Sequence, residues 1–176
     1  MPLPRECPLC NATENKQSTV TAHVFGGKGR NHAFYYCESC EVRYQFPSLT
    51  PQEEEYFYAA EFENFMSRRS GIEGGWKNAE EHVTSNEATR QRRMKYLGTH
   101  LSKDCKILEI GCSSGFMLYP LVTEGYYCRG IEPSGVFRDF VKSKGIKVYK
   151  SIDNMESLSP SGGFDLILHF FVLEHI

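Results

Sequence analysis

The chain has 176 residues, an apolar fraction of 40% and a formal net charge of −2 at pH 7. This composition suffices for a globular core, and the near-neutral charge argues against a strongly electrostatic partner such as duplex DNA. No apolar run reaches membrane-spanning length, and the N-terminus lacks the basic-then-apolar pattern of a signal peptide. We therefore expect a cytoplasmic protein with no membrane partner.

Two C-x-x-C pairs stand near the N-terminus, Cys7 with Cys10 and Cys37 with Cys40. In a reducing compartment such pairs indicate a metal site rather than disulfides. Each pair can present two thiolates from one tight turn, and two such turns close a tetrahedral site around Zn²⁺. Four thiolates leave no position for water, so the predicted zinc is structural. With strand-like stretches at residues 18–25 and 33–37, residues 1–50 are expected to form a zinc-ribbon-like module.

Other interpretations of these cysteines stay open. The two pairs are separated by 26 residues, somewhat longer than the commonest spacing, so His23 or His32 is an alternative to one of the thiols. Four free thiols without a metal are a second alternative. A redox C-x-x-C is less favoured, because neither pair opens a helix after a strand.

Residues 51–104 are expected to be a helical linker. Thr50 and Pro51, followed by an acidic first turn, are typical of a helix start. The aromatic residues that follow have helical spacing and favour a packing role. After a glycine-containing break at 70–75, a polar helix is predicted over 76–101. Its basic side chains are interpreted as a solvated face rather than as an anion site: Arg90, Arg92, Arg93 and Lys95.

An apolar strand predicted over 106–110 breaks into a turn of small residues from Gly111 to Gly115 and continues as a helix. The G-x-x-x-G spacing differs from the G-x-G-x-x-G pattern typical of NAD-binding proteins. Glu109 precedes the first glycine by two positions, where a carboxylate suits a ligand ammonium and repels a pyrophosphate. A second strand, 127–132, ends in Glu132, and an acid at that place accepts hydrogen bonds from ribose hydroxyls.

The remaining pattern predicts a parallel sheet. Helices are expected over 116–124 and 135–144, with Pro120 bending or shortening the first, and strands over 146–149 and 164–171. The last strand is fully apolar, as in a sheet covered on both faces. The three remaining cysteines fit core positions: Cys105, Cys112 and Cys128. We therefore predict an α/β fold, with the N-terminal half of a Rossmann-like domain over 105–176.

With these motifs the chain resembles the class I S-adenosylmethionine-dependent methyltransferases. Their E/D-x-G-x-G-x-G motif is present as residues 109–115, except that Ser113 replaces the middle glycine and its side chain must fit beside the ligand. The resemblance continues at 130–134, 164–167 and 172–176. It implies that the turn and the second strand's acid hold S-adenosylmethionine, through Glu109, Gly111, Cys112, Ser113, Gly115 and Glu132.

The resemblance implies further roles. The helix from residue 76 to 96 is a candidate lid over the cofactor. In the family the loop after the third strand contacts adenine, and Asn154 is the candidate contact, although Asp153 and Met155 share that loop. His175 falls where the family places residues near the acceptor. It is a candidate catalytic base, with a helix-capping role as the alternative. Family members that carry a C-x-x-C module often act in sugar or polysaccharide pathways, which implies a small, sugar-like methyl acceptor.

The favoured function is methyl transfer from S-adenosylmethionine to a small molecule. The resemblance predicts about three more strands beyond residue 176, so we expect a sheet truncated at its C-terminal side, whose exposed edge promotes self-association. The alternative function is a non-catalytic zinc-ribbon module that binds a protein or single-stranded nucleic acid and carries a vestigial cofactor domain. A nicotinamide-dependent oxidoreductase is a second rival, against which Glu109 argues.

Overall fold

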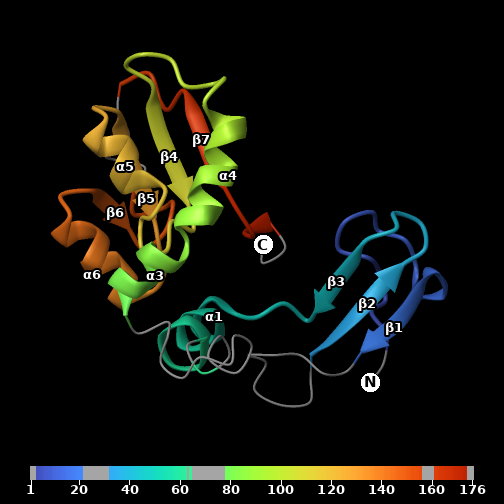
Figure 1. The fold of residues 1–176 in the computed structure, drawn as a ribbon. Coiled ribbons are helices and arrows are strands. Elements are labelled where there is room, and N and C mark those ends of the chain that lie inside the picture. The colour runs from blue at the N-terminus through green and yellow to red at the C-terminus, as the bar shows by residue number, and fades with distance from the viewer. Residues whose placement is uncertain (1–2, 22–31, 63, 65–77, 156–160, 174–176) are drawn as a thin grey trace. The chain divides into compact units, whose positions relative to one another are not determined.

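The computed structural model describes residues 3–21, 32–62, 64, 78–155 and 161–173 (Figure 1). The chain divides into two compact units, Met1–Phe65 and Met66–Ile176, and each is described by itself. Within the described ranges, none of the helices has the length and apolar character needed to cross a membrane.

The first unit contains a short helical turn η1 (Glu14–Lys16) and three antiparallel strands in the order β1-β2-β3. These are β1 (Gln17–Thr21), β2 (Ala33–Cys37) and β3 (Arg43–Phe46). Side chains alternate along β2, so that Ala33, Tyr35 and Cys37 are buried. The predicted strand over 18–25 is present up to Thr21, and its remainder lies outside the described residues. β3, which was not predicted, pairs Tyr44 with Tyr35.

Two short helices follow in the same unit, α1 (Pro51–Tyr56) and the π-helical turn η2 (Phe57–Glu61). The predicted helix start is confirmed. Thr50 Oγ1 accepts a hydrogen bond from the Glu53 N–H at 3.2 Å, and the Glu53 carboxylate accepts one from the Thr50 N–H at 2.8 Å. This reciprocal pair satisfies donors that the first helical turn would otherwise leave open.

The second unit is built on four parallel strands in the order β6-β5-β4-β7. They are β4 (Lys106–Ile110), β5 (Tyr127–Ile131), β6 (Lys147–Tyr149) and β7 (Leu166–His169). The chain builds outward from β4 to β6 and then returns to the other side of β4 with β7. The prediction of an α/β Rossmann-like sheet that follows a small cysteine-containing module along the chain is confirmed. In such sheets, ligands bind at the carboxyl ends of the strands where the order reverses.

Helices cover one face of this sheet (Figure 1). They are α4 (Glu87–Leu97), α5 (Leu118–Thr123) and α6 (Gly135–Ser143). Their apolar side chains pack on alternate strand residues in one core cluster that includes Ile107, Leu118, Leu121, Cys128, Val141, Val148 and Leu168. The other face carries a smaller buried cluster of Leu108, Ile131 and Met155. The three cysteines predicted as core residues are all buried.

The single helix predicted over 76–101 is instead two helices, α3 (Ala79–Ser85) and α4. Asn86 separates them with φ −98° and ψ 7°, and its side chain donates to the His82 carbonyl at 2.8 Å. Asparagine competes in this way with the helical backbone, which explains the break. The first crossover helix is also shorter than predicted. Because α5 begins at Leu118, Pro120 stands in its first turn, where no intrahelical N–H is required.

Candidate functional site

The glycine turn lies at the carboxyl end of β4 and is tied to its neighbour β5. The N–H groups of Gly111 and Cys112 both donate to the Ile131 carbonyl, at 2.9 and 3.0 Å. Three turn residues have positive φ: Gly111 at 70°, Ser113 at 51° and Gly115 at 72°. Glycine adopts this conformation without steric cost, whereas for Ser113 it is unfavourable. The turn therefore holds a serine in a strained backbone conformation.

Glu109 is the last acidic residue before this turn and is almost completely buried, with 2% of its surface exposed. Its Oε2 atom is enclosed and has no hydrogen-bond partner among the described residues. Burial raises the pKa of Glu109 to about 8, and Arg93 opposes this rise while Glu132 adds to it. At neutral pH the ligand-free carboxyl is therefore mostly protonated. An acid in this state gains a strong interaction when a cation binds beside it.

Glu132 follows β5 and is also buried, at 6% exposure. Its two carboxylate oxygens accept hydrogen bonds from the backbone N–H groups of Ser113, at 2.7 Å, and Ser134, at 2.8 Å. Burial raises the pKa of Glu132, and these N–H groups and Arg138 oppose that rise. One bond to each oxygen fixes the carboxylate and leaves each oxygen able to accept a second bond. The acid is thus held beside the glycine turn, with capacity for ligand hydroxyls.

The turn is closely packed by the chain itself. A Cβ atom on Gly111 would lie 2.8 Å from Val172 Cγ2, and one on Gly130 of β5 would lie 2.5 Å from Cys112 Sγ. Val172 therefore makes a close approach to the backbone of Gly111. Cys112 faces the core. Ser113 Oγ, like Glu109 Oε2, is enclosed and has no hydrogen-bond partner among the described residues.

Two residues that the sequence did not single out for this site lie close to it. His82 of α3 forms a 2.8 Å hydrogen bond with Ser114 Oγ, and burial lowers its pKa to about 4. It is therefore neutral at pH 7. Arg93 of α4, predicted to be part of a solvated face, instead has its Cζ atom 3.8 Å from the centre of the Phe170 ring. No periodic signal distinguishes a side chain that turns toward a site from its solvated neighbours on the same helix.

Arg93 is a cation without an acidic partner among the described residues, although it interacts electrostatically with Glu109. Burial lowers the pKa of its guanidinium, while Glu109 opposes that change. The Phe116 ring centre also lies 5.3 Å from its Cζ atom. Two aromatic rings thus position a desolvated guanidinium near the buried acid.

Two further candidate residues are Asn154 and His175. Asn154 is exposed in the loop after β6, where its Oδ1 accepts a hydrogen bond from the Ser151 hydroxyl at 2.9 Å. Met155 beside it is buried in the smaller core cluster. His175, the candidate base, lies outside the described residues, as does the whole glycine-containing break at 70–75.

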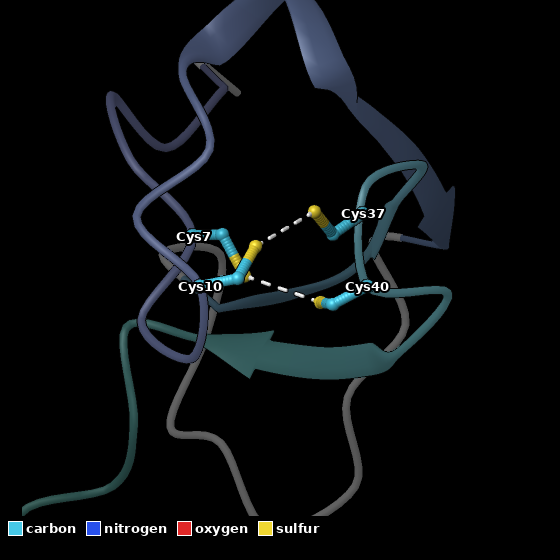
Figure 2. A group of neighbouring side chains, drawn as sticks. All are labelled: Cys7, Cys10, Cys37 and Cys40. Carbon is cyan, nitrogen blue, oxygen red and sulfur yellow. Dashed lines mark hydrogen bonds between the residues drawn. The ribbon is translucent and has the colours of Figure 1, made fainter.

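The first unit brings its four paired cysteines together. The Sγ atoms of Cys7, Cys10, Cys37 and Cys40 all lie within 4.8 Å of one another, and Figure 2 shows the four side chains converging from two turns. The Cys7–Cys40 sulfur distance is 3.8 Å and the Cys10–Cys37 distance is 3.6 Å. A tetrahedral zinc with bonds of about 2.3 Å places its sulfur ligands about 3.8 Å apart. The cluster therefore fits such an ion.

Hydrogen bonds from the backbone and burial shift the pKa values of the thiols in different directions. Burial alone raises the pKa of Cys37, but hydrogen bonds from the N–H groups of Cys40 and Ser39 outweigh this and lower it to about 6. A hydrogen bond from the Ala12 N–H favours a lower pKa of Cys10. Desolvation and the neighbouring thiols outweigh this effect and raise the pKa of Cys10 to about 12. The N–H groups of Cys40 and Ser39 thus favour the thiolate form of Cys37, which is the form that binds a metal ion.

A hydrogen-bonded pair behind the sulfur atoms supports this cluster and was not predicted. The Gln17 amide donates to Cys37 Sγ at 3.8 Å and to the Ala12 carbonyl at 2.9 Å. Tyr44 in turn donates its hydroxyl to Gln17 Oε1 at 2.8 Å. His32, the proposed substitute ligand, lies with Nδ1 2.7 Å from the Pro47 carbonyl oxygen. His23 lies outside the described residues.

Comparison with known proteins gives one informative similarity. Over 76 residues the chain is 29% identical to the ubiquinone biosynthesis O-methyltransferase of Rhizobium leguminosarum bv. trifolii (strain WSM2304). The match covers 40% of this chain and 30% of that protein, so the chain spans less than a third of this relative. No protein-family model matches the chain. The activity named for that relative is methyl transfer.

Replacing Ser113 by glycine separates stability from ligand binding. The change removes an unfavourable positive φ and a buried hydroxyl without a partner, so the free energy of unfolding is expected to rise by about 1 kcal/mol. If the hydroxyl bonds the ligand, the affinity for S-adenosylhomocysteine falls several-fold at the same time. Denaturant unfolding and calorimetry measure the two quantities. Ser114→Ala is the control, because losing the bond to His82 lowers stability instead. A free energy of unfolding for Ser113→Gly below that of the unmodified protein would contradict the assignment of a strained backbone at Ser113.

Replacing Gln17 by leucine tests the support behind the cysteine cluster. Loss of the amide that donates to Cys37 is expected to weaken zinc binding about tenfold, measured by competition with a chromophoric chelator. Gln45→Leu is the matched control, because the Gln45 amide nitrogen is buried without a partner among the described residues. Equal zinc affinities for the two variants would show that Gln17 does not act on the metal site.

Proposed function

We propose that this chain binds S-adenosylmethionine and takes part in transfer of its methyl group to a small-molecule acceptor. The observation that carries the proposal is the buried Glu109 carboxyl, whose Oε2 atom lacks a partner at the end of the central strand. The glycine turn, the acid after β5 and the similarity to a methyltransferase support it.

The charged groups of the cofactor match the groups of the site. Glu109 would accept hydrogen bonds from the ammonium of the methionine part, and this cation would draw the carboxyl into its ionised form. Arg93, which has no ion-pair partner among the described residues, would attract the carboxylate of the same ligand. Glu132, held by two N–H groups, has a free acceptor position on each oxygen for the ribose hydroxyls. The Ser113 hydroxyl is a further donor at the turn.

The proposed reaction is consistent with these groups. The bound cofactor supplies an electrophilic methyl group on a sulfonium, and the protein's main contribution is to align donor and acceptor. Asn154 is proposed to contact adenine and His175 to act as the base for the acceptor. The acceptor itself is proposed to be small and sugar-like, on the resemblance alone. Self-association through the outer strands β6 and β7, which end the described sheet, remains a proposal.

The cysteine cluster is proposed to bind one structural zinc ion per chain, held by Cys7, Cys10, Cys37 and Cys40. Four sulfur ligands complete a tetrahedral shell, so the ion would stabilise the small unit and supply no reactive water. Apart from the proposed ligands Cys7 and Cys37, the buried cluster of this unit contains Ala33, Tyr35 and Tyr44 among the described residues. Such a core is too small to stabilise the unit without further cross-linking.

The rival function is a non-catalytic module in which the sheet no longer binds a cofactor. Against it, the second unit keeps a buried acid without a partner, which costs stability and has no structural use in the described residues. A nicotinamide cofactor is less compatible with the site, because its pyrophosphate would lie beside the two acids Glu109 and Glu132.

Calorimetry with S-adenosylhomocysteine tests the proposed function. Saturable binding is expected, and Glu132→Ala should weaken it by at least tenfold because bonds to a charged, buried acceptor are lost. Glu109→Gln should weaken it similarly. Glu81→Ala is the matched control, since this carboxylate is exposed on α3. Absence of binding, or tighter binding of NAD than of S-adenosylhomocysteine, would contradict the proposal.

A further inference from the structure

Arg129 of β5 is a buried cation without an anion. Its side chain lies on the sheet face opposite the helices, and only 8% of the residue is exposed. Its Nε donates to the Tyr127 hydroxyl at 2.7 Å and its Nη1 to the Tyr149 hydroxyl at 3.1 Å. No carboxylate among the described residues pairs with it. Buried charges in proteins are normally paired, so this arrangement needs an explanation.

The surroundings of Arg129 are aromatic and positively charged. The Tyr127 and Tyr149 ring centres lie 4.9 and 5.9 Å from its Cζ atom, which holds the guanidinium in a fixed position. Its remaining nitrogen, Nη2, has no acceptor in the described part of the chain and is not among the fully enclosed atoms. This nitrogen keeps donors available to a molecule that enters from solvent.

A cavity of about 460 Å³ opens at this position, on the outer edge of the sheet. Three cations line it, Arg129 from β5, Lys142 from α6 and Lys147 from β6, and none of its lining residues is acidic. Neither lysine forms an ion pair with a described residue. Lys144, two positions after Lys142, does pair with Glu80 at 3.7 Å. Among its lining residues the charge of the cavity is therefore entirely positive.

Two of these cations are direct neighbours on paired strands. Arg129 and Lys147 occupy partner positions in the β5–β6 register, so their side chains project from the same face on strands about 4.8 Å apart. Like charges at such positions repel each other and reduce sheet stability. An anion bound between the two cations would turn this repulsion into a net attraction. The guanidinium is suited to bind phosphate oxygens in bidentate fashion.

We propose that this cavity is a binding site for a phosphate or diphosphate group, with Arg129, Lys142 and Lys147 as its ligands. The tyrosines hold the guanidinium ready, and the lysines supply mobile charges at the rim. The site is separate from the glycine turn and does not depend on the proposed methyl transfer. Its ligand is a phosphorylated small molecule, whose uncharged part would extend into the open cavity.

Calorimetric titration with inorganic pyrophosphate at low ionic strength tests this site. Saturable binding is expected, weaker for inorganic phosphate, and reduced by added salt because the lysines are exposed. Lys142→Gln and Lys147→Gln should each weaken pyrophosphate binding about tenfold, and the double variant should abolish it. Both residues are exposed, so these variants keep the fold. Lys103→Gln is the matched control, because it removes the same charge outside the cavity.

A second titration separates this site from the cofactor site. Protein saturated with S-adenosylhomocysteine should bind pyrophosphate with unchanged affinity, because the lining residues of the cavity do not include the glycine turn. Failure of the proposed cofactor binding would leave the pyrophosphate result intact. The proposal is overturned if the unmodified protein shows no saturable binding, if the double variant binds like Lys103→Gln, or if S-adenosylhomocysteine competes with pyrophosphate.

Discussion

The proposed chemistry of the second unit depends on a carboxyl group that is buried at the end of the central strand. Burial raises the pKa of Glu109 from its ordinary value of 4.5 to about 8. Because the folded-state pKa lies above the unfolded value, Glu109 increasingly destabilises the fold as pH rises from 4.5 to 8. At pH 7 this cost is about 3 kcal/mol. In the proposed complex a bound cation would offset it, so that ligand binding and stability would be coupled through one side chain.

The elements around Glu109 serve to keep it in this position. β4 lies between β5 and β7, so the acid is surrounded by backbone on both sides. The partner of Glu109 across β5 is Gly130, which leaves room for Cys112 of the turn. The turn is bonded to the end of β5 and donates an N–H to Glu132. The turn and Glu132 are therefore directly bonded, and Glu109 interacts electrostatically with Glu132.

Much of this arrangement could be predicted because it depends on local patterns. The strand-turn-helix at residues 106–123, the acid after β5 and the four cysteines all follow from spacing along the chain. The parallel sheet follows from the alternation of strands and helices. Asn86 shows where local patterns are insufficient. An amide at this position fits both a helical surface and a cap, and the choice depends on what α3 and α4 pack against.

The rest of the site depends on contacts between segments far apart in the chain. Arg93 and His82 reach the glycine turn because α3 and α4 are placed beside it, and no spacing in the sequence encodes that placement. Val172 covers Gly111 for the same reason, so the glycine serves a close contact within the chain. Gln17 supports the cysteine cluster from a strand rather than from either C-x-x-C turn. Sequence patterns predicted where the two acids, the turn and the four cysteines lie better than they predicted the residues that pack around them.

The pH titration of the Glu109 side-chain carboxyl, followed by carbon-13 NMR and assigned with Glu109→Gln, tests the central claim most directly. We predict a midpoint near pH 8 in the ligand-free protein. With S-adenosylhomocysteine bound, the midpoint should fall by about two pH units or more, because the ligand ammonium stabilises the ionised form. A midpoint near 4.5 without ligand, or one that the ligand leaves unchanged, would contradict the role assigned to this buried acid.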